Sequence, residues 1–188
     1  MVAEASHKAG EKGVALAKQY LEGTTHIELP FDAYETPEQT TLIRLDGKRK
    51  AYDLAGHNIT TRRPLYVEVK KYNVVGKQPV EYIEYLANAY SITARDVAEG
   101  LDRKREFMWI TWHPFHQTKW SKLTSKSEIE DALSEYPECL NGEEISGGVV
   151  DLVAGRLWLL MLNNRQEDLF LTREELYRVQ ATLQRKGA

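Results

Sequence analysis

Two carboxylates and one amine near the middle of the chain have residue types and a spacing suited to binding a cation. Glu68 and Lys70 stand two residues apart in the stretch LYVEVKKY, so on a strand both side chains point to the same face. Asp53 precedes them in the stretch KAYDLAGHN. Two carboxylates held close together repel each other unless one is protonated or a cation lies between them. Lys70 relieves part of that repulsion, and a divalent metal ion would relieve more.

The spacing of these residues also predicts that they meet. If the two stretches form a symmetric hairpin with its turn between Thr60 and Thr61, opposed residues have numbers that sum to about 121. Asp53 then lies across from Glu68, with Cβ atoms roughly 5 Å apart. The simpler interpretation is a cross-strand ion pair between Lys70 and one carboxylate. That interpretation leaves the second carboxylate unexplained.

The pattern resembles the PD-(D/E)xK nuclease superfamily, which has the restriction-endonuclease-like fold. The resemblance rests on YDLAG, with Asp53, and on VEVKKY, with Glu68 and Lys70. Members often carry a glutamate on their first helix, and HKAGEKGVALAKQYLE supplies Glu11 here. Gly10 and Gly13 would let that end of the helix approach the sheet closely. The resemblance covers roughly residues 5–115 and departs at Tyr52, which stands where the motif has a proline.

The resemblance implies a fold, a cofactor and a reaction. The fold is α/β with an αβββαβ core, a mixed central sheet flanked by helices and a C-terminal helix-strand-helix extension. Asp53, Glu68 and the Val69 carbonyl would bind Mg²⁺, for which Mn²⁺ could substitute, with waters completing the shell. Lys70 would orient and help deprotonate the attacking water or stabilise the transition state. Glu11 would be an outer ligand or part of a second metal site.

The function implied is metal-dependent hydrolysis of nucleic acid, with a DNA endonuclease of restriction, repair, recombination or antiphage defence as the first hypothesis. Cutting two strands usually needs two active sites, so a homodimer or a subunit of a larger complex is expected. The alternative is a non-catalytic, nuclease-like subunit that binds nucleic acid or acts as a scaffold. An unrelated small-molecule enzyme is disfavoured because the sequence has no phosphate-binding glycine loop and no nucleophile motif.

The charge distribution favours a polyanionic partner. Although the net charge is −3, residues 44–77 hold nine Lys or Arg against three Asp or Glu, and residues 103–126 hold six against one. Basic residues that contact phosphates hold a nucleic acid without reading its sequence. The expected phosphate contacts are Lys48, Arg49, Lys50, Arg62, Arg63, Lys71 and Lys77. The alternative is solvated charge scattered over the surface.

Composition sets the class of protein. The 188 residues are 42% apolar and 28% charged, which is ordinary for a globular domain. The one cysteine, Cys139, allows neither an internal disulfide nor a cysteine-based metal site. The sequence contains neither a run of about 20 apolar residues nor a signal-peptide core, so we expect a cytoplasmic protein without a membrane partner.

Periodicity predicts the elements that must position the site. Helices are expected over 5–22, from 80 to 90 with a second helix over 91–100, over 125–136 and over 171–187; strands are expected over 25–31, 40–46, 50–57, 64–72, 106–115 and 156–162. We expect a single nuclease-like domain over 1–188, with a core over about 5–122 and a C-terminal extension over about 123–188. The acidic block 127–151 is expected to be a solvated helix and loop, with a turn at SGG.

The stretch WITWHPFHQTKW raises three alternatives. His113 and His116 could bind a metal, but a third ligand is not evident. The aromatic residues could stack on bases next to Lys119. The simplest interpretation is a loop at the end of a strand, packed by its own aromatic residues. On the helix after the motif strand, neither Gln78 nor Tyr82 can be assigned to the site from its position.

Overall fold

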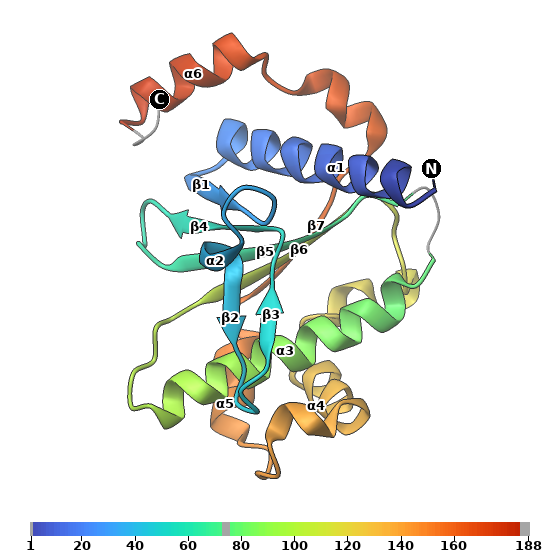
Figure 1. Cartoon of the computed structure of the whole chain (residues 1–188), viewed down its shortest axis with the longest axis vertical. Coiled ribbons are helices and arrows are strands. Elements are labelled where there is room, and N and C mark those ends of the chain that lie inside the picture. The colour runs from blue at the N-terminus through green and yellow to red at the C-terminus, as the bar shows by residue number, and fades with distance from the viewer. Residues whose placement is uncertain (1, 73–75, 185–188) are drawn as a thin grey trace.

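The computed structural model describes the main chain of residues 2–72 and 76–184, and the side chains of residues 10–72 and 76–184. The fold is α/β: a five-stranded mixed sheet has helices on both faces (Figure 1). Across the sheet the strands are β1 (Ile27–Asp32), β4 (Leu54–Asn58), β5 (Pro64–Lys70), β6 (Glu106–Thr111) and β7 (Leu157–Met161).

Strand β5 is the central strand, which explains its apolar sequence. It pairs antiparallel with β4 on one side and parallel with β6 on the other. Strand β1 extends the antiparallel side and β7 extends the parallel side. Because both edges and both faces of β5 are covered, Leu65, Val67 and Val69 are all buried.

One face of the sheet is covered by α1 (Val2–Thr24), and α6 (Arg173–Thr182) lies against that helix (Figure 1). Val14, Ala17 and Leu21, spaced three and four residues apart, form the apolar stripe of α1, and all three are buried. It packs in one hydrophobic cluster with Leu54 and the apolar residues of β5. Helix α6 begins with a capping box: the Thr172 side chain accepts from the Glu175 N–H, and the Glu175 side chain accepts from the Thr172 N–H. Residues 185–187 of that predicted helix lie outside the described residues.

The other face is covered by α3 (Gln78–Ala98). Helices α4 (Lys126–Glu135) and α5 (Gly147–Ala154) pack against α3. A layer of aromatic side chains fills the space between α3 and the sheet. The rings of Tyr82 and Tyr85 lie 5.2 Å and 5.3 Å, centroid to centroid, from the ring of Trp109 on β6. The prediction of two helices over 80–100 is wrong, because a single helix runs through Ser91 and Thr93. Both hydroxyls bond to backbone carbonyls, so neither caps a second helix.

The strand predicted over 50–57 is divided between two sheets. Its first part is β3 (Arg49–Ala51), which pairs with β2 (Thr41–Ile43) in a separate two-stranded sheet, preceded by α2 (Pro37–Thr40). Its second part is β4 in the main sheet. The division falls between two adjacent N–H groups: Tyr52 donates to the Thr40 carbonyl, and Asp53 donates to the Val67 carbonyl. Asp53 therefore lies where the chain passes from the small sheet to the large one.

The tip of the β2–β3 hairpin is fastened to α3. The Arg44 guanidinium donates to the Asn88 side chain at 2.9 Å, and the Leu45 N–H donates to the Ser91 hydroxyl at 3.0 Å. Arg44 is itself 8% exposed and bonds to Asp46. These contacts hold the hairpin in place across the face of α3, as Figure 1 shows.

The C-terminal third belongs to the same layers as the core. Strand β7 is the fifth strand of the sheet, and the packing of α4 and α5 on α3 continues the aromatic core. The acidic side chains of the block 127–151 are mostly exposed, as predicted, but the SGG sequence predicted as a turn begins α5 instead. Val149, Val150 and Val153 of this helix are buried. The described chain also contains three short 3₁₀ helices: Gln117–Lys122, Pro137–Leu140 and Asn164–Leu169.

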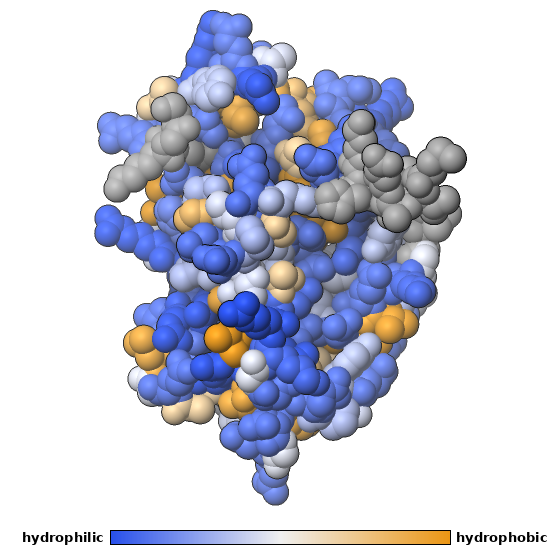
Figure 2. Space-filling view, in the orientation of Figure 1, coloured by the Kyte–Doolittle hydropathy of each residue, from blue (hydrophilic) through white to orange (hydrophobic). Residues whose placement is uncertain are grey.

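The face seen in Figure 2 is mainly hydrophilic, with apolar residues in small separate groups. Within the described parts of the chain, none of the helices combines the length and the apolar character needed to cross a bilayer.

A close approach between the backbones of β1 and β4 predicts a stability effect. A Cβ added at Gly56 on β4 would lie 1.9 Å from the Glu28 carbonyl oxygen of β1, next to an irregularity in the pairing of these strands. We expect Gly56→Ala to destabilise the fold by roughly 2 kcal/mol or more, measured by urea denaturation.

Gly147→Ala is the matched control, because a Cβ there meets no described atom within 4 Å. We expect its stability to stay within about 0.5 kcal/mol of the wild type or to rise slightly. Equal stability of both variants would contradict the close approach of β1 and β4.

Candidate active site

Asp53 directly precedes β4 and is held there by hydrogen bonds to the two neighbours of Glu68 in the chain. Its N–H donates to the Val67 carbonyl at 2.9 Å, and its Oδ2 accepts from the Val69 N–H at 2.6 Å. The predicted register is confirmed for the paired residues, since Leu54 is opposite Val67 and Ala55 is opposite Tyr66. Asp53 and Glu68 are the next residues beyond that ladder.

Glu68 lies on the face of β5 that meets α3 and contacts two ammonium groups. Its Oε1 is 2.9 Å from Lys70 Nζ, and its Oε2 is 2.9 Å from Lys50 Nζ. Lys70 follows on the same strand, whereas Lys50 comes from β3 of the small sheet. Glu68 is 7% exposed, so these contacts are made largely out of water. One buried carboxylate therefore holds two lysines.

The pKa values of the two carboxylates are shifted in opposite directions. Burial, and then the charge of Glu68, raise the pKa of Asp53 to about 6, although the hydrogen bond from the Val69 N–H opposes the rise. Burial alone would raise the pKa of Glu68, but Lys50 and Lys70 hold that pKa below its ordinary value. Asp53 thus carries the unrelieved part of the repulsion, and a further cation would bind where that repulsion is greatest.

Lys70 is held in the charged form. Burial alone would lower the pKa of Lys70, but the Glu68 carboxylate outweighs burial and raises it above its ordinary value. Its ammonium is also 3.6 Å from Glu81 on α3 and 5.6 Å from the centre of the Trp109 ring. A lysine that keeps its proton at neutral pH can stabilise negative charge but is a poor base.

Glu81 is a site residue that the sequence interpretation missed. It stands three positions after Gln78 on α3 and reaches Lys70 across the end of the sheet; it also accepts from the Tyr72 hydroxyl at 3.1 Å. The available signal was its place on the first turn of the helix that follows the motif strand. Of the two residues left unassigned, Gln78 accepts from Thr111 and Tyr82 donates to the Leu123 carbonyl.

The donor atoms fit a hard divalent cation. The Lys70 carbonyl accepts from the Trp112 N–H on the β6 side, so strand alternation turns the main chain of Val69 toward the β4 side, where Asp53 lies. Two carboxylates and one carbonyl are an oxygen set of the kind that Mg²⁺ prefers. Among the described residues, however, no cluster of three or more His, Cys, Asp or Glu side chains could hold a metal ion. A cation here would have Asp53, Glu68, the Val69 carbonyl and water as ligands.

Glu11 is near this site but does not complete it. Helix α1 does come close to the end of β5, because a Cβ added at Gly13 would lie 2.7 Å from Lys71 Cβ. Glu11 is exposed, and within the described chain it forms no three-acid cluster with Asp53 and Glu68. Tyr34 links the two regions: burial, then Asp53, then Glu11 raise the pKa of its phenol.

The seven predicted phosphate contacts are placed at different distances from the acids. Lys50 touches Glu68, and Lys71 follows Lys70 but pairs with Glu167 and lies over the Trp112 ring at 4.5 Å. Lys48 and Arg49 are exposed on the β2–β3 hairpin, and Lys77 is exposed just before α3. Arg62 and Arg63 precede β5 and thus lie at its opposite end from Glu68, where Arg63 pairs with Glu106 at 3.1 Å.

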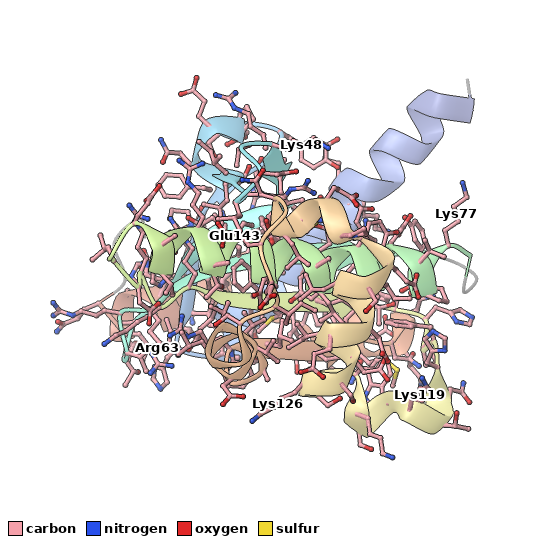
Figure 3. The ribbon with its side chains drawn as sticks, turned by 90° about the horizontal axis from the view of Figure 1, so that it is seen from below. Lys48, Arg63, Lys77, Lys119, Lys126 and Glu143 are labelled. Carbon is pink, nitrogen blue, oxygen red and sulfur yellow. The ribbon has the colours of Figure 1, made fainter. Side chains whose placement is uncertain are left out.

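The basic blocks do not gather on one surface. Figure 3 shows Arg63 and Lys77 at opposite ends of the molecule, with Lys48 and Lys126 on opposite sides. In the second block, Arg103 and Arg105 both bond to Asp96 of α3. Of the seven predicted contacts, the two that the structure puts beside the acids are therefore Lys50, which pairs with Glu68, and Lys71, which directly follows Lys70.

The loop after β6 is packed by its aromatic residues, as the simplest interpretation predicts. Trp112 and Phe115 are buried, and the Phe115 and Trp120 rings are 5.9 Å apart, centroid to centroid. His113 and His116 belong to no group of metal-ligating side chains among the residues that the structure describes.

Comparison with models of known protein families, with curated proteins and with solved structures found no match.

The raised pKa of Asp53 predicts a pH-dependent stability without divalent metal. The unfolded chain ionises at the ordinary pKa of 3.8, below the folded value of about 6, so the fold loses stability as the pH rises through that window. Asp53→Asn removes the charge and should stabilise the fold by up to about 3 kcal/mol at pH 7.5, measured by urea denaturation in EDTA. The gain should vanish near pH 3.5.

Asp46→Asn is the control of opposite sign. The hydrogen bond from Arg44 lowers the pKa of Asp46, so its contribution is present above pH 3.8 and is lost as the pH falls. That variant should be less stable than the wild type at pH 7.5. A loss of stability in Asp53→Asn at pH 7.5 would show that the carboxylate is not under repulsion.

Proposed function

We propose that this chain is a metal-dependent phosphodiesterase that hydrolyses nucleic acid. One observation carries the proposal: Asp53 and Glu68 meet at the end of the central strand, where burial and then the charge of Glu68 raise the pKa of Asp53, and Lys70 contacts Glu68. A site of this kind suits a hard cation next to a phosphate.

The arrangement of elements supports the same proposal. Taken in order, α1, β1, β4, β5, α3 and β6 fit the αβββαβ core of the restriction-endonuclease-like fold, with the β2–β3 hairpin inserted before β4. The acids lie at the junction of β4 and β5, and α1 approaches from the opposite face. We assign the chain to the PD-(D/E)xK superfamily on these grounds.

The residues would divide the chemistry as follows. Asp53, Glu68 and the Val69 carbonyl would hold Mg²⁺ or Mn²⁺, which when bound polarises the phosphate and lowers the pKa of a coordinated water. Lys70, fixed by Glu68 and Glu81, would place a permanent positive charge beside the reacting phosphate. Its raised pKa favours this role over that of a base. Glu11 would act at most through water.

The substrate that we propose is DNA, and the enzyme class is an endonuclease of restriction, repair, recombination or antiphage defence. Lys48 and Arg49 on the hairpin that also carries Lys50, and Lys77 before α3, would contact its backbone, because their side chains are exposed. A homodimer or a larger complex would bring two such sites to a duplex.

The ion pairs themselves support one alternative, a non-catalytic subunit that binds nucleic acid or acts as a scaffold. Both oxygens of Glu68 already contact lysine ammonium groups, so this carboxylate is neutralised without a metal ion. A domain that had lost catalysis could keep such a network for stability. The same experiment separates the two functions.

The test is incubation of plasmid, linear and branched DNA with the protein in Mg²⁺ or Mn²⁺ and in EDTA. We expect cleavage with metal only, and we expect Asp53→Ala and Lys70→Ala each to lower its rate at least about a hundredfold, because each removes a group that contacts the metal or the developing charge.

Lys126→Ala is the control variant, since its side chain pairs with Asp151 of α5 and touches neither acid. It should cleave like the wild type. Full activity of Asp53→Ala would exclude this site, and DNA binding without cleavage in either metal would favour the scaffold. Circular dichroism of each variant checks that the fold is kept.

A further inference from the structure

Lys50 occupies one side of the candidate cation site. Its Nζ lies 2.9 Å from Glu68 Oε2, the oxygen that Lys70 does not contact. It reaches the site from β3, in a sheet separate from the one that carries Glu68. Its ammonium also lies 5.2 Å from the centre of the buried Tyr52 ring. The positive charge nearest that oxygen is therefore supplied by a long, flexible side chain from outside the main sheet.

The two lysines that contact Glu68 differ in their number of carboxylate partners. Lys70 has a second carboxylate, Glu81, at 3.6 Å, and its side chain is 17% exposed. For Lys50, Glu68 is the one ion-pair partner within the described chain, and its side chain is 22% exposed. An incoming cation that competes for Glu68 would thus displace Lys50 at lower cost than Lys70.

We propose that Lys50 is a resident counter-ion that a divalent cation displaces from Glu68, and that the released ammonium then contacts the phosphate backbone of the substrate. The inference rests on the proposed function and adds a coupling: metal binding and nucleic-acid binding strengthen each other through one side chain. It also explains how the buried Glu68 carboxylate is kept neutralised before the metal arrives.

The hairpin geometry limits the motion to the side chain. Arg44 and Leu45 fasten the hairpin to Asn88 and Ser91 of α3, so the backbone at residue 50 stays in place. A lysine side chain has a flexible four-carbon stem. This stem is long enough for the ammonium to move from a carboxylate at the sheet to the surface of the same hairpin. There it would join Lys48 and Arg49, which are already exposed.

The first test measures metal affinity directly, without turnover. Mn²⁺ binding to the full-length protein is followed by electron paramagnetic resonance for the wild type, Lys50→Met and Lys48→Met. Removing the competing ammonium should tighten Mn²⁺ binding roughly tenfold in Lys50→Met. Lys48→Met is the matched control, because Lys48 lies on the same hairpin but pairs with Asp46 at 3.8 Å, so its metal affinity should change less than twofold.

The second test uses the wild type and so does not depend on how a variant folds. Lysine acetylation is quantified by peptide mass spectrometry with and without saturating Mg²⁺, and Lys126, which pairs with Asp151, is the internal reference. Release from Glu68 should increase the labelling rate of Lys50 several-fold relative to Lys126. Metal should also strengthen binding of a short DNA duplex, measured with Ca²⁺, more in the wild type than in Lys50→Met.

The outcomes separate this inference from the proposed function. A wild type that neither binds Mn²⁺ nor cleaves DNA would exclude the function itself. A wild type that binds metal and cleaves, with unchanged or weaker Mn²⁺ binding in Lys50→Met, would exclude the displacement of Lys50 alone. Equal tightening in Lys48→Met and Lys50→Met would also exclude it, because the effect would then come from net charge rather than from the contact with Glu68.

Discussion

The repulsion between the Asp53 and Glu68 carboxylates is the constraint on which the rest of this structure depends. Both acids are largely buried at the end of the central strand, where the interaction between charges is strong. The fold compensates with two ammonium groups and a backbone N–H, yet the pKa of Asp53 still rises to about 6. Replacing one of the acids would remove this repulsion, and the proposed cation site offers a reason for having both.

The site exists because the chain changes sheets at one peptide. Tyr52 is buried in the aromatic layer under α3, and Leu54 is buried in the cluster under α1. Asp53 lies between these two anchors, with its carboxylate bonded to the edge of β5. The surrounding rings keep the layer rigid at a cost: the Tyr52 and Tyr85 hydroxyls and the Trp109 N–H are buried and have no hydrogen-bond partner among the described residues. Asp53 is therefore held in position by packing on both faces of the sheet.

Much of this geometry could be predicted from the sequence because it depends on local periodicity. Alternation along residues 65–69 identifies a buried central strand, the symmetry of the hairpin sets its register, and the stripe at Val14, Ala17 and Leu21 orients α1. The role of Lys50 could not be predicted, since it depends on β3 leaving the main sheet for a partner that only tertiary packing defines. Glu81 was missed for a similar reason: the sequence puts it on the first turn of the helix after β5, but only tertiary packing brings that turn within reach of Lys70. Helix α5 was missed because SGG favours a turn, whereas its three buried valines stabilise a helix against α3.

The charged ammonium of Lys70 has a different role in each of the two candidate functions, the metal-dependent nuclease and the non-catalytic scaffold. Its ammonium is shared between Glu68 on the sheet and Glu81 on the helix, so it couples the strand that carries the acids to the helix that covers them. In a scaffold this bridge would be the purpose of the network. Asp53 would then be superfluous, because within the described chain both lysines pair with Glu68 and neither pairs with Asp53. In a metal-dependent enzyme the same bridge fixes a positive charge beside a carboxylate that awaits a cation. The unrelieved charge of Asp53, rather than the ion pairs of Glu68, is thus the feature that favours catalysis.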